Sequence, residues 1–193
     1  MKINLTKKIS LLVSRPLRFV LDNEPQLELK LKKNHAVIIP DLPSTFKLRT
    51  YKEVDEDAVV NLLNRVGINL SSKELRIAFE TCLPEGCFLV EDEGENVVSM
   101  MMARHINSNG RLFSGRIDWL ATDPDFTGLG LGTVSASSAA RRLQDAGYDD
   151  IWATTDDHRL GAIKVFYKIG FRPHIYDEIK DRWQKVIKIL GIG

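Results

Sequence analysis

The feature that most constrains this 193-residue chain is an apolar segment that runs into a glycine-rich turn near residue 130. The apolar segment stops at Pro124, and Gly128, Gly130 and Gly132 alternate with leucines before an expected helix. Glycine has no Cβ, so the backbone can turn sharply there and approach a ligand closely. The N–H groups of such a turn, with those of a helix start, form a site for an anion such as phosphate.

Apolar periodicity around this turn predicts a mixed α/β (α+β) fold. Hairpins and crossovers both occur, so we expect a mixed, mostly antiparallel sheet with helices on both faces. Asp55 and the capping-box pattern at Ser71–Glu74 predict two helix starts, and Pro84–Gly86 is expected to end the second helix. The expected strands lie at 46–51, 87–91, 97–104, 112–122, 151–155, 171–176 and 183–190, and the later helices at 133–146 and 157–169.

Residues 1–45 are harder to interpret and are predicted to form an N-terminal extension docked on the domain at 46–193. Ile9–Val13 and Leu17–Leu21 suit strands or a short helix, and Val37–Ile39 is a short apolar run. Leu27–Leu31 alternates strictly, which predicts a strand with one wet face. An edge strand of this kind can pair with another copy, so a homodimer is one expectation.

Composition excludes several classes of protein. The chain is 44% hydrophobic and 27% charged with a net charge of +1, which argues against dedicated nucleic-acid or membrane-surface binding. No apolar run approaches the roughly 20 residues that span a bilayer, and no secretory cleavage site is evident, so we expect a cytoplasmic protein. Cys82 and Cys87 lack a usual zinc spacing, and no metal site is predicted.

Besides an anion site, the glycine turn has three other interpretations. A dinucleotide-binding fingerprint fails at its third glycine, where Ser135 stands, and few residues follow it. A Walker phosphate loop fails because no Gly-Lys-Ser/Thr follows the turn. A βα turn without any ligand remains open, although three alternating glycines exceed what a tight turn requires.

Three segments of the chain together resemble the GCN5-related N-acetyltransferase (GNAT) family. They are Leu120-Ala-Thr-Asp-Pro124, Thr127-Gly-Leu-Gly-Leu-Gly132 and the segment from Ala162 that ends Lys168-Ile-Gly-Phe171. The resemblance covers residues 46 to 176. It implies a GNAT-like fold and transfer of an acetyl group from acetyl-CoA to a primary amine, by direct attack and without a covalent enzyme intermediate.

The resemblance also implies a donor site. Backbone groups of the strand end would bind the pantetheine arm and polarise the thioester carbonyl, a form of oxyanion stabilisation. Backbone N–H groups of the glycine turn would bind the pyrophosphate, and one helix face would complete the site. The implied residues are Leu120, Ala121, Thr122, Thr127, Gly128, Leu129, Gly130, Leu131, Gly132, Thr133, Arg159, Ala162 and Phe166.

The sequence departs from the family pattern at three of these positions. Thr127 stands where the family usually has Arg or Gln, and Arg159 stands where it often has Asn. Phe166 takes the place of a tyrosine that can protonate the leaving thiolate; Tyr167 is the candidate acid but lies about 100° further around the helix. Loss of a general acid typically slows a reaction by about 10²–10⁴-fold. Phe166 and Thr127 favour an alternative, a CoA-binding or assembly module without catalysis.

Asp118 is the leading candidate for the base that deprotonates the amine. Side chains alternate along a strand, so Asp118 is predicted to share a face with Leu120 and Thr122. A carboxylate at that depth is suited to proton transfer. The same alternation directs Trp119 to the opposite face, as a core residue.

Other assignments for these groups stay open at the level of sequence. Asp118 could instead pair with Arg104 or Arg116, and Glu91 and His105 are further candidates for the base. The acceptor is expected to be a small-molecule or protein amine, because nothing in the sequence distinguishes the two.

Overall fold

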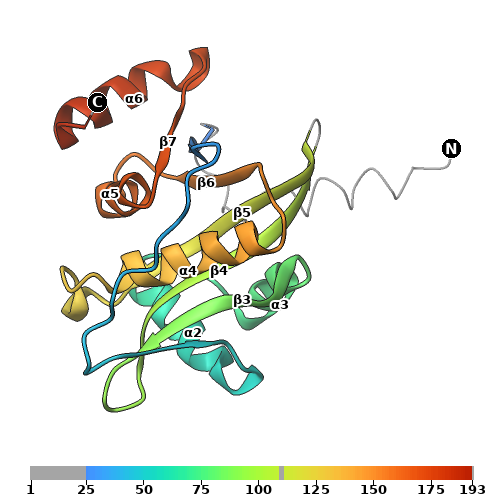
Figure 1. Ribbon diagram of the computed structural model, residues 1–193. Helices are drawn as coiled ribbons and strands as arrows, with labels where there is room; N and C mark the ends of the chain where they lie inside the picture. Colours follow the sequence, from blue (N-terminus) through green and yellow to red (C-terminus); the bar gives the residue numbers. More distant parts are fainter. Residues whose placement is uncertain (1–24, 109–110, 193) are drawn as a thin grey trace, which may run out of the picture.

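The computed structural model describes residues 25–108 and 111–192, which form a seven-stranded mixed sheet with helices on both faces (Figure 1). The strand order is β2-β3-β4-β5-β6-β1-β7, and only β5 and β6 pair in parallel. The predicted fold class is confirmed. The strands are β1 (Leu27–Leu31), β2 (Lys47–Thr50), β3 (Cys82–Glu91), β4 (Val97–Ser108), β5 (Arg111–Thr122), β6 (Ile151–Thr155) and β7 (Phe171–His174). The helices are α2 (Glu56–Arg65), α3 (Ser72–Phe79), α4 (Leu131–Asp145), α5 (Leu160–Lys168) and α6 (Asp177–Leu190), with short 3-10 turns at Glu53–Asp55 and Pro124–Phe126.

The two faces of the sheet carry separate cores. Met101 and Ala103 of β4 pack in the core that includes α4 and α5, whereas Met100 and Met102 pack in the core of α2 and α3. This division follows from the alternation of side chains along β4. Helix α4 crosses the sheet on one face, and α2 and α3 lie on the other (Figure 1). The core to which a strand residue belongs therefore shows on which face of the sheet its side chain lies.

Strand β1 lies inside the sheet, between β6 and β7 and antiparallel to both. Leu27, Leu29 and Leu31 are at most 5% exposed and belong to the main core. The prediction of a strand at 27–31 is confirmed, but neither of its edges is free, so it cannot add to another copy as an edge strand. The extension is thus not simply docked on the sheet. The predictions for residues 9–13 and 17–21 lie outside the described residues.

The start of α3 matches its prediction, whereas its end does not. The Ser71 N–H donates to the Glu74 carboxylate at 2.8 Å, and the Glu74 N–H donates to the Ser71 hydroxyl at 3.3 Å. The helix ends at Phe79, and β3 already begins at Cys82, so Pro84–Gly86 lies within a strand. The β3–β4 register shifts across this stretch. Proline, which has no N–H to donate, is tolerated at such an irregularity.

The C-terminal segment is a helix, and the strand predicted at 183–190 is wrong. Ile179, Trp183 and Val186 are the buried residues of α6, and their spacing of four and three is that of one helical face. The sequence pattern from residue 183 onward is short and apolar enough to fit either element. Gly191 ends the helix in the left-handed region at φ 62°.

Candidate active site

The candidate site is a cavity that opens where two parallel strands separate. Gly115–Ile117 of β5 pairs with Ile151–Ala153 of β6, and no pairing follows beyond these residues. A cavity of about 570 Å³ lies past this point. Its lining includes residues 117–120 of β5, 154–156 at the end of β6, the α2–α3 loop at 66–70 and the first turns of α5. Divergence of the strands leaves backbone groups that can bind an extended ligand.

A β-bulge at Trp119 changes which way the following side chains point. Trp119 has a φ of 63°, and the register shifts between the Met100–Ala121 and Met102–Asp118 pairs. One extra residue on a strand reverses the alternation beyond it. Asp118 consequently pairs on the α2/α3 face, whereas Leu120 packs in the core of α4 and α5.

The prediction that Asp118 shares a face with Leu120 and Thr122 is therefore wrong. The Thr122 hydroxyl lies 3.0 Å from the hydroxyl of Ser99, which also lies 3.2 Å from that of Ser135 on α4. Trp119, expected in the core on the far face, is half-buried and lines the cavity. Simple alternation could not anticipate this, because no glycine or proline marks the bulge.

Asp118 is bound by two buried arginines. Its Oδ2 accepts from Arg104 Nη1 at 2.9 Å and from Arg116 Nε at 2.7 Å, and all three side chains are at most 8% exposed. Arg116 Nη2 is buried and has no hydrogen-bond partner in the described part of the chain. This is the paired alternative for Asp118. Both hydrogen bonds are made to one carboxylate oxygen, and the role of Asp118 as base stays a prediction.

The glycine turn presents unpaired donors at the start of α4. Gly128 and Gly130 have φ of 82° and 84°, and a Cβ at either would meet nothing within 4 Å. Among the described residues, no acceptor is recorded for the backbone N–H groups from Gly128 to Gly132. A Cβ at Gly132 would lie 2.8 Å from Thr122 Oγ1, so this glycine lets the helix start approach the strand end. The open turn and its free donors fit a phosphate group.

The remaining implied residues of the strand and turn divide into two groups. Leu120 lines the cavity, whereas the Ala121 carbonyl accepts from the Ser99 hydroxyl at 2.9 Å. The Thr127 hydroxyl donates to the Pro124 carbonyl at 3.1 Å. Phosphate binding at this turn would thus rest on backbone groups. Leu129 is 49% exposed, and Leu131 and Thr133 are buried in the first turn of α4.

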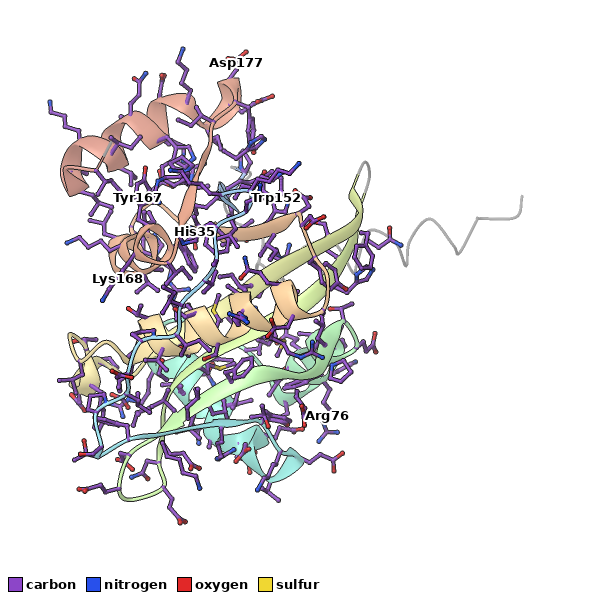
Figure 2. The ribbon with its side chains drawn as sticks, in the orientation of Figure 1. His35, Arg76, Trp152, Tyr167, Lys168 and Asp177 are labelled. Atoms are coloured by element: carbon purple, nitrogen blue, oxygen red, sulfur yellow. The ribbon has the colours of Figure 1, made fainter. Side chains whose placement is uncertain are left out.

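Helix α5 brings Arg159, Ala162 and Phe166 to the cavity. Arg159 Nη2 donates to the Leu120 carbonyl at 3.1 Å, across the gap between the strands. Burial lowers the pKa of the Arg159 guanidinium. Phe166 is 2% exposed. Tyr167, labelled on α5 in Figure 2, does not line the cavity. The Arg172 guanidinium lies 4.7 Å from its ring centre. The rotation of about 100° per residue explains this difference, and the structure places the candidate acid Tyr167 outside the site.

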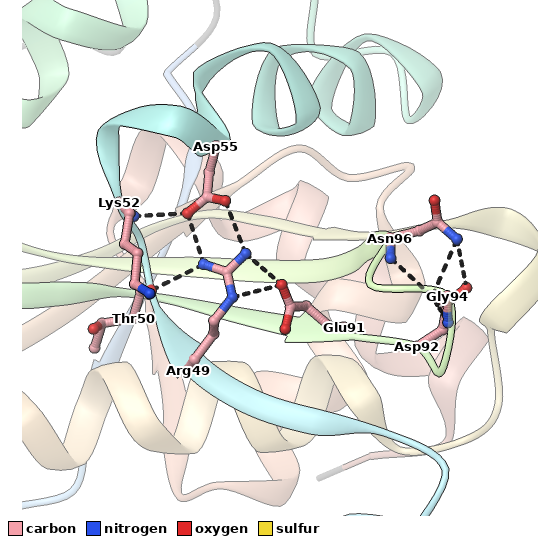
Figure 3. Close-up of polar contacts among 8 residues, drawn as sticks. All are labelled: Arg49, Thr50, Lys52, Asp55, Glu91, Asp92, Gly94 and Asn96. Carbon is pink, nitrogen blue, oxygen red and sulfur yellow. Dashed lines mark hydrogen bonds and ion pairs between the residues drawn. The ribbon is translucent and has the colours of Figure 1, made fainter.

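The other two candidates for the base also lie outside the cavity lining. Glu91 Oε1 accepts from Arg49 Nε at 2.6 Å (Figure 3), and His105 Nδ1 lies 2.9 Å from the Tyr148 hydroxyl. The sequence did not single out Asp156 and His158, which line the cavity. Their position after a strand parallel to β5 was the available signal, because the carboxyl ends of parallel strands share one edge of a sheet.

Comparison with known proteins agrees with this geometry. The model of the acetyltransferase (GNAT) family matches residues 56–171. The chain belongs to this family. The match contains the bulged strand, the glycine turn and α5, and of these the strand and α5 line the cavity. No curated protein matches the chain by sequence.

Solved structures of acetyltransferases share the fold at low sequence identity. A GCN5-related N-acetyltransferase from Sphaerobacter thermophilus aligns with a TM-score of 0.64 at 14% identity, covering 78% of this chain and 50% of its own. A Trypanosoma brucei acetyltransferase gives 0.54 at 19% identity, with coverage of 68% and 96%. The ribosomal-protein-S18-alanine N-acetyltransferase of Escherichia coli gives 0.55 at 17%, with coverage of 67% and 79%. This chain thus spans half the length of the first of these proteins.

The described residues lack both a candidate membrane-spanning helix and a cluster of metal-ligating side chains. In residues 25–108 and 111–192, no helix combines the length and the apolar character needed to cross a bilayer. The same residues contain no group of three or more His, Cys, Asp or Glu side chains placed to hold a metal ion.

Proposed function

We propose that this protein is an acyl-CoA-dependent N-acetyltransferase in which a primary amine attacks the thioester directly. The observation that carries the proposal is the cavity at the divergence of β5 and β6, with the unpaired N–H groups of the α4 start after the end of β5. When bound, acetyl-CoA supplies an activated acyl carbon and a thiolate leaving group.

The chain contributes binding and orientation through its backbone. The N–H groups from Gly128 to Gly132 would bind the pyrophosphate. The positive end of the α4 dipole lies at this helix start and favours the negative charge of that group. The strand around Leu120 would bind the pantetheine arm and direct an N–H group at the thioester oxygen. Ala162 and Phe166 would form the apolar wall that excludes water.

The proton balance of the transfer is simple. A C–N bond forms as the C–S bond breaks, the nitrogen loses one proton, and the thiolate gains one. The thiolate of a thiol with a pKa of about 8.5 can take that proton from water, so no general acid is required. Asp156 and His158 line the cavity and join Asp118 as candidates for receiving the proton from nitrogen.

A CoA-binding module without catalysis is the second candidate function. Two observations favour it: Phe166, without a proton to donate, lines the cavity, and Tyr167 contacts Arg172 outside it. In such a module the donor would bind with the same backbone groups, but amines would not react.

Calorimetric titration with acetyl-CoA tests the donor site. Glutamate at Gly130 would place a side chain and a negative charge in the phosphate site, so binding should weaken by at least about 100-fold. Gly147→Glu is the matched control, because Gly147 also has a φ of 84° and open space around its Cβ, at the other end of α4. Equal loss in both variants, or no binding by folded wild type, would contradict the proposal.

Thiol release with a panel of amines then separates the two candidate functions. The enzyme should release CoA in proportion to acetylated amine, with the Gly130→Glu variant inactive. Tight binding of acetyl-CoA without turnover on any amine, small or peptide, would identify the non-catalytic module instead.

A further inference from the structure

We propose that Arg159 is a specificity-determining residue that binds a substrate carboxylate in the cavity. This inference rests on the proposed function and names a substrate class for it. The carboxylate belongs either to the acyl group of the donor or to the acceptor amine, and the chemistry of recognition is the same in both cases.

Within the described residues, the Arg159 guanidinium lacks a counter-ion at contact distance. Its one recorded hydrogen bond goes to a neutral group, the Leu120 carbonyl, at 3.1 Å. Among the described residues, no carboxylate lies within ion-pair distance of it. Burial lowers its pKa, and the charge of Asp156 only partly offsets this. A desolvated guanidinium is stabilised by an anionic ligand that replaces lost hydration.

The carboxylates near Arg159 already have partners. Asp118 is shared by Arg104 and Arg116, at 2.9 and 2.7 Å. Asp156 Oδ1 accepts from Gln26 Nε2 at 3.3 Å. The Arg104–Asp118–Arg116 cluster carries one more positive than negative charge, and the buried Arg116 Nη2 has no partner among residues 25–108 and 111–192. The field beside the cavity therefore favours an anion over the cationic ligand that a free amine alone would present.

The position of Arg159 also suits it to bind a substrate carboxylate. It precedes α5 and reaches across the gap to Leu120, the part of β5 where the proposed function places the thioester. A substrate carboxylate paired with it would lie close to the reacting atoms. A guanidinium has five N–H donors in a planar fork, so it can keep its bond to the Leu120 carbonyl and still bind a carboxylate oxygen.

Matched ligand pairs test the proposal on the full chain. For the donor, calorimetry compares succinyl-CoA with butyryl-CoA, which has the same acyl length and no carboxylate. For the acceptor, turnover with acetyl-CoA compares glycine with glycinamide and glutamate with its α-amide. We expect wild type to prefer the carboxylate member of one pair by about 10- to 100-fold, the range for a charged hydrogen bond.

The variant Arg159→Gln should abolish this preference, which is a ratio within each ligand pair and does not depend on the overall affinity for CoA thioesters. Arg142→Gln is the control, because Arg142 Nε also donates to a backbone carbonyl, that of Pro84, but does not line the cavity. Arg159→Lys should keep part of the preference. If Arg159→Gln does not fold by circular dichroism, the reduced preference expected of Arg159→Lys in the same ligand pairs decides.

Three outcomes overturn the proposal. Wild type that binds and uses acetyl-CoA without a carboxylate preference in either pair contradicts it and leaves the proposed function standing. A preference that survives Arg159→Gln assigns the carboxylate to another group. Absence of binding by every CoA thioester removes the proposed function and this proposal together.

Discussion

Two arginine–carboxylate clusters in this protein have opposite compositions. Arg49 holds two carboxylates: Asp55, with bonds of 2.6 and 2.8 Å, and Glu91 (Figure 3). Near the cavity the ratio is reversed, because Arg104 and Arg116 share Asp118. The first cluster has an excess negative charge and is partly exposed, whereas the second has an excess positive charge and is buried.

The difference shows what each cluster is suited to do. Arg49 joins β2, the turn before α2 and the end of β3, and Asp55 and Glu91 together raise its pKa. That cluster ties three chain segments together. In the second cluster Arg116 Nη2 stays without a partner, and Asp118 lies on the wall of the cavity. Ion pairs of similar geometry can thus brace a fold in one place and shape the field of a site in another.

The largest expected effect comes from breaking the buried cluster. Asp118→Asn removes the charge that compensates two buried guanidinium groups and should cost about 3–5 kcal/mol in the free energy of unfolding. Urea unfolding measures this, and turnover is measured on the folded fraction. A variant as stable as wild type but inactive would show instead that Asp118 serves as the catalytic base.

A smaller effect is expected at the partly exposed cluster. Arg49→Gln leaves Asp55 and Glu91 side by side without their shared donor and should cost about 1–3 kcal/mol. The control is Arg141→Gln, which breaks an exposed pair with Asp145 one helical turn away and should cost less than about 0.5 kcal/mol. Equal losses of unfolding free energy in the two variants would mean that the Arg49 cluster does not stabilise the fold.

The smallest effect is a change in acid sensitivity. The hydrogen bond from Arg49 holds the pKa of Asp55 below its ordinary value of 3.8. Its contribution is therefore present above that value and is lost as the pH falls through the lower, folded-state pKa. Wild type should lose more unfolding free energy than Arg49→Gln between about pH 5 and about pH 3. If wild type and Arg49→Gln lose the same unfolding free energy between the two pH values, the Arg49–Asp55 bond is not the source of the acid sensitivity.

Local features of the site were readable in the sequence. The glycine turn, the capping box at Ser71 and the different directions of Phe166 and Tyr167 follow from backbone freedom, side-chain reach and helical rotation. Asp55 shows the limit of such arguments. It was predicted to cap α2, but its side chain makes no capping bond there and instead binds Arg49.

Long-range features were not readable. The bulge at Trp119 depends on how β5 meets β4, and it decides which face Asp118 occupies. The interior position of β1 depends on pairing with two strands more than 120 residues away in the chain. The helical state of residues 183–190 depends on Ile179 and on the core that α6 contacts.

The sequence by itself determined the strand–turn–helix unit, its free backbone donors and the family, because these rest on residues close together in the chain. Only the tertiary structure decided that Asp118 pairs with two arginines and that Arg159 reaches Leu120 with no counter-ion among the described residues. The physical reason is that charge compensation depends on distance in space and on burial. Both are set by strand register and helix placement, which the order of residues does not specify locally.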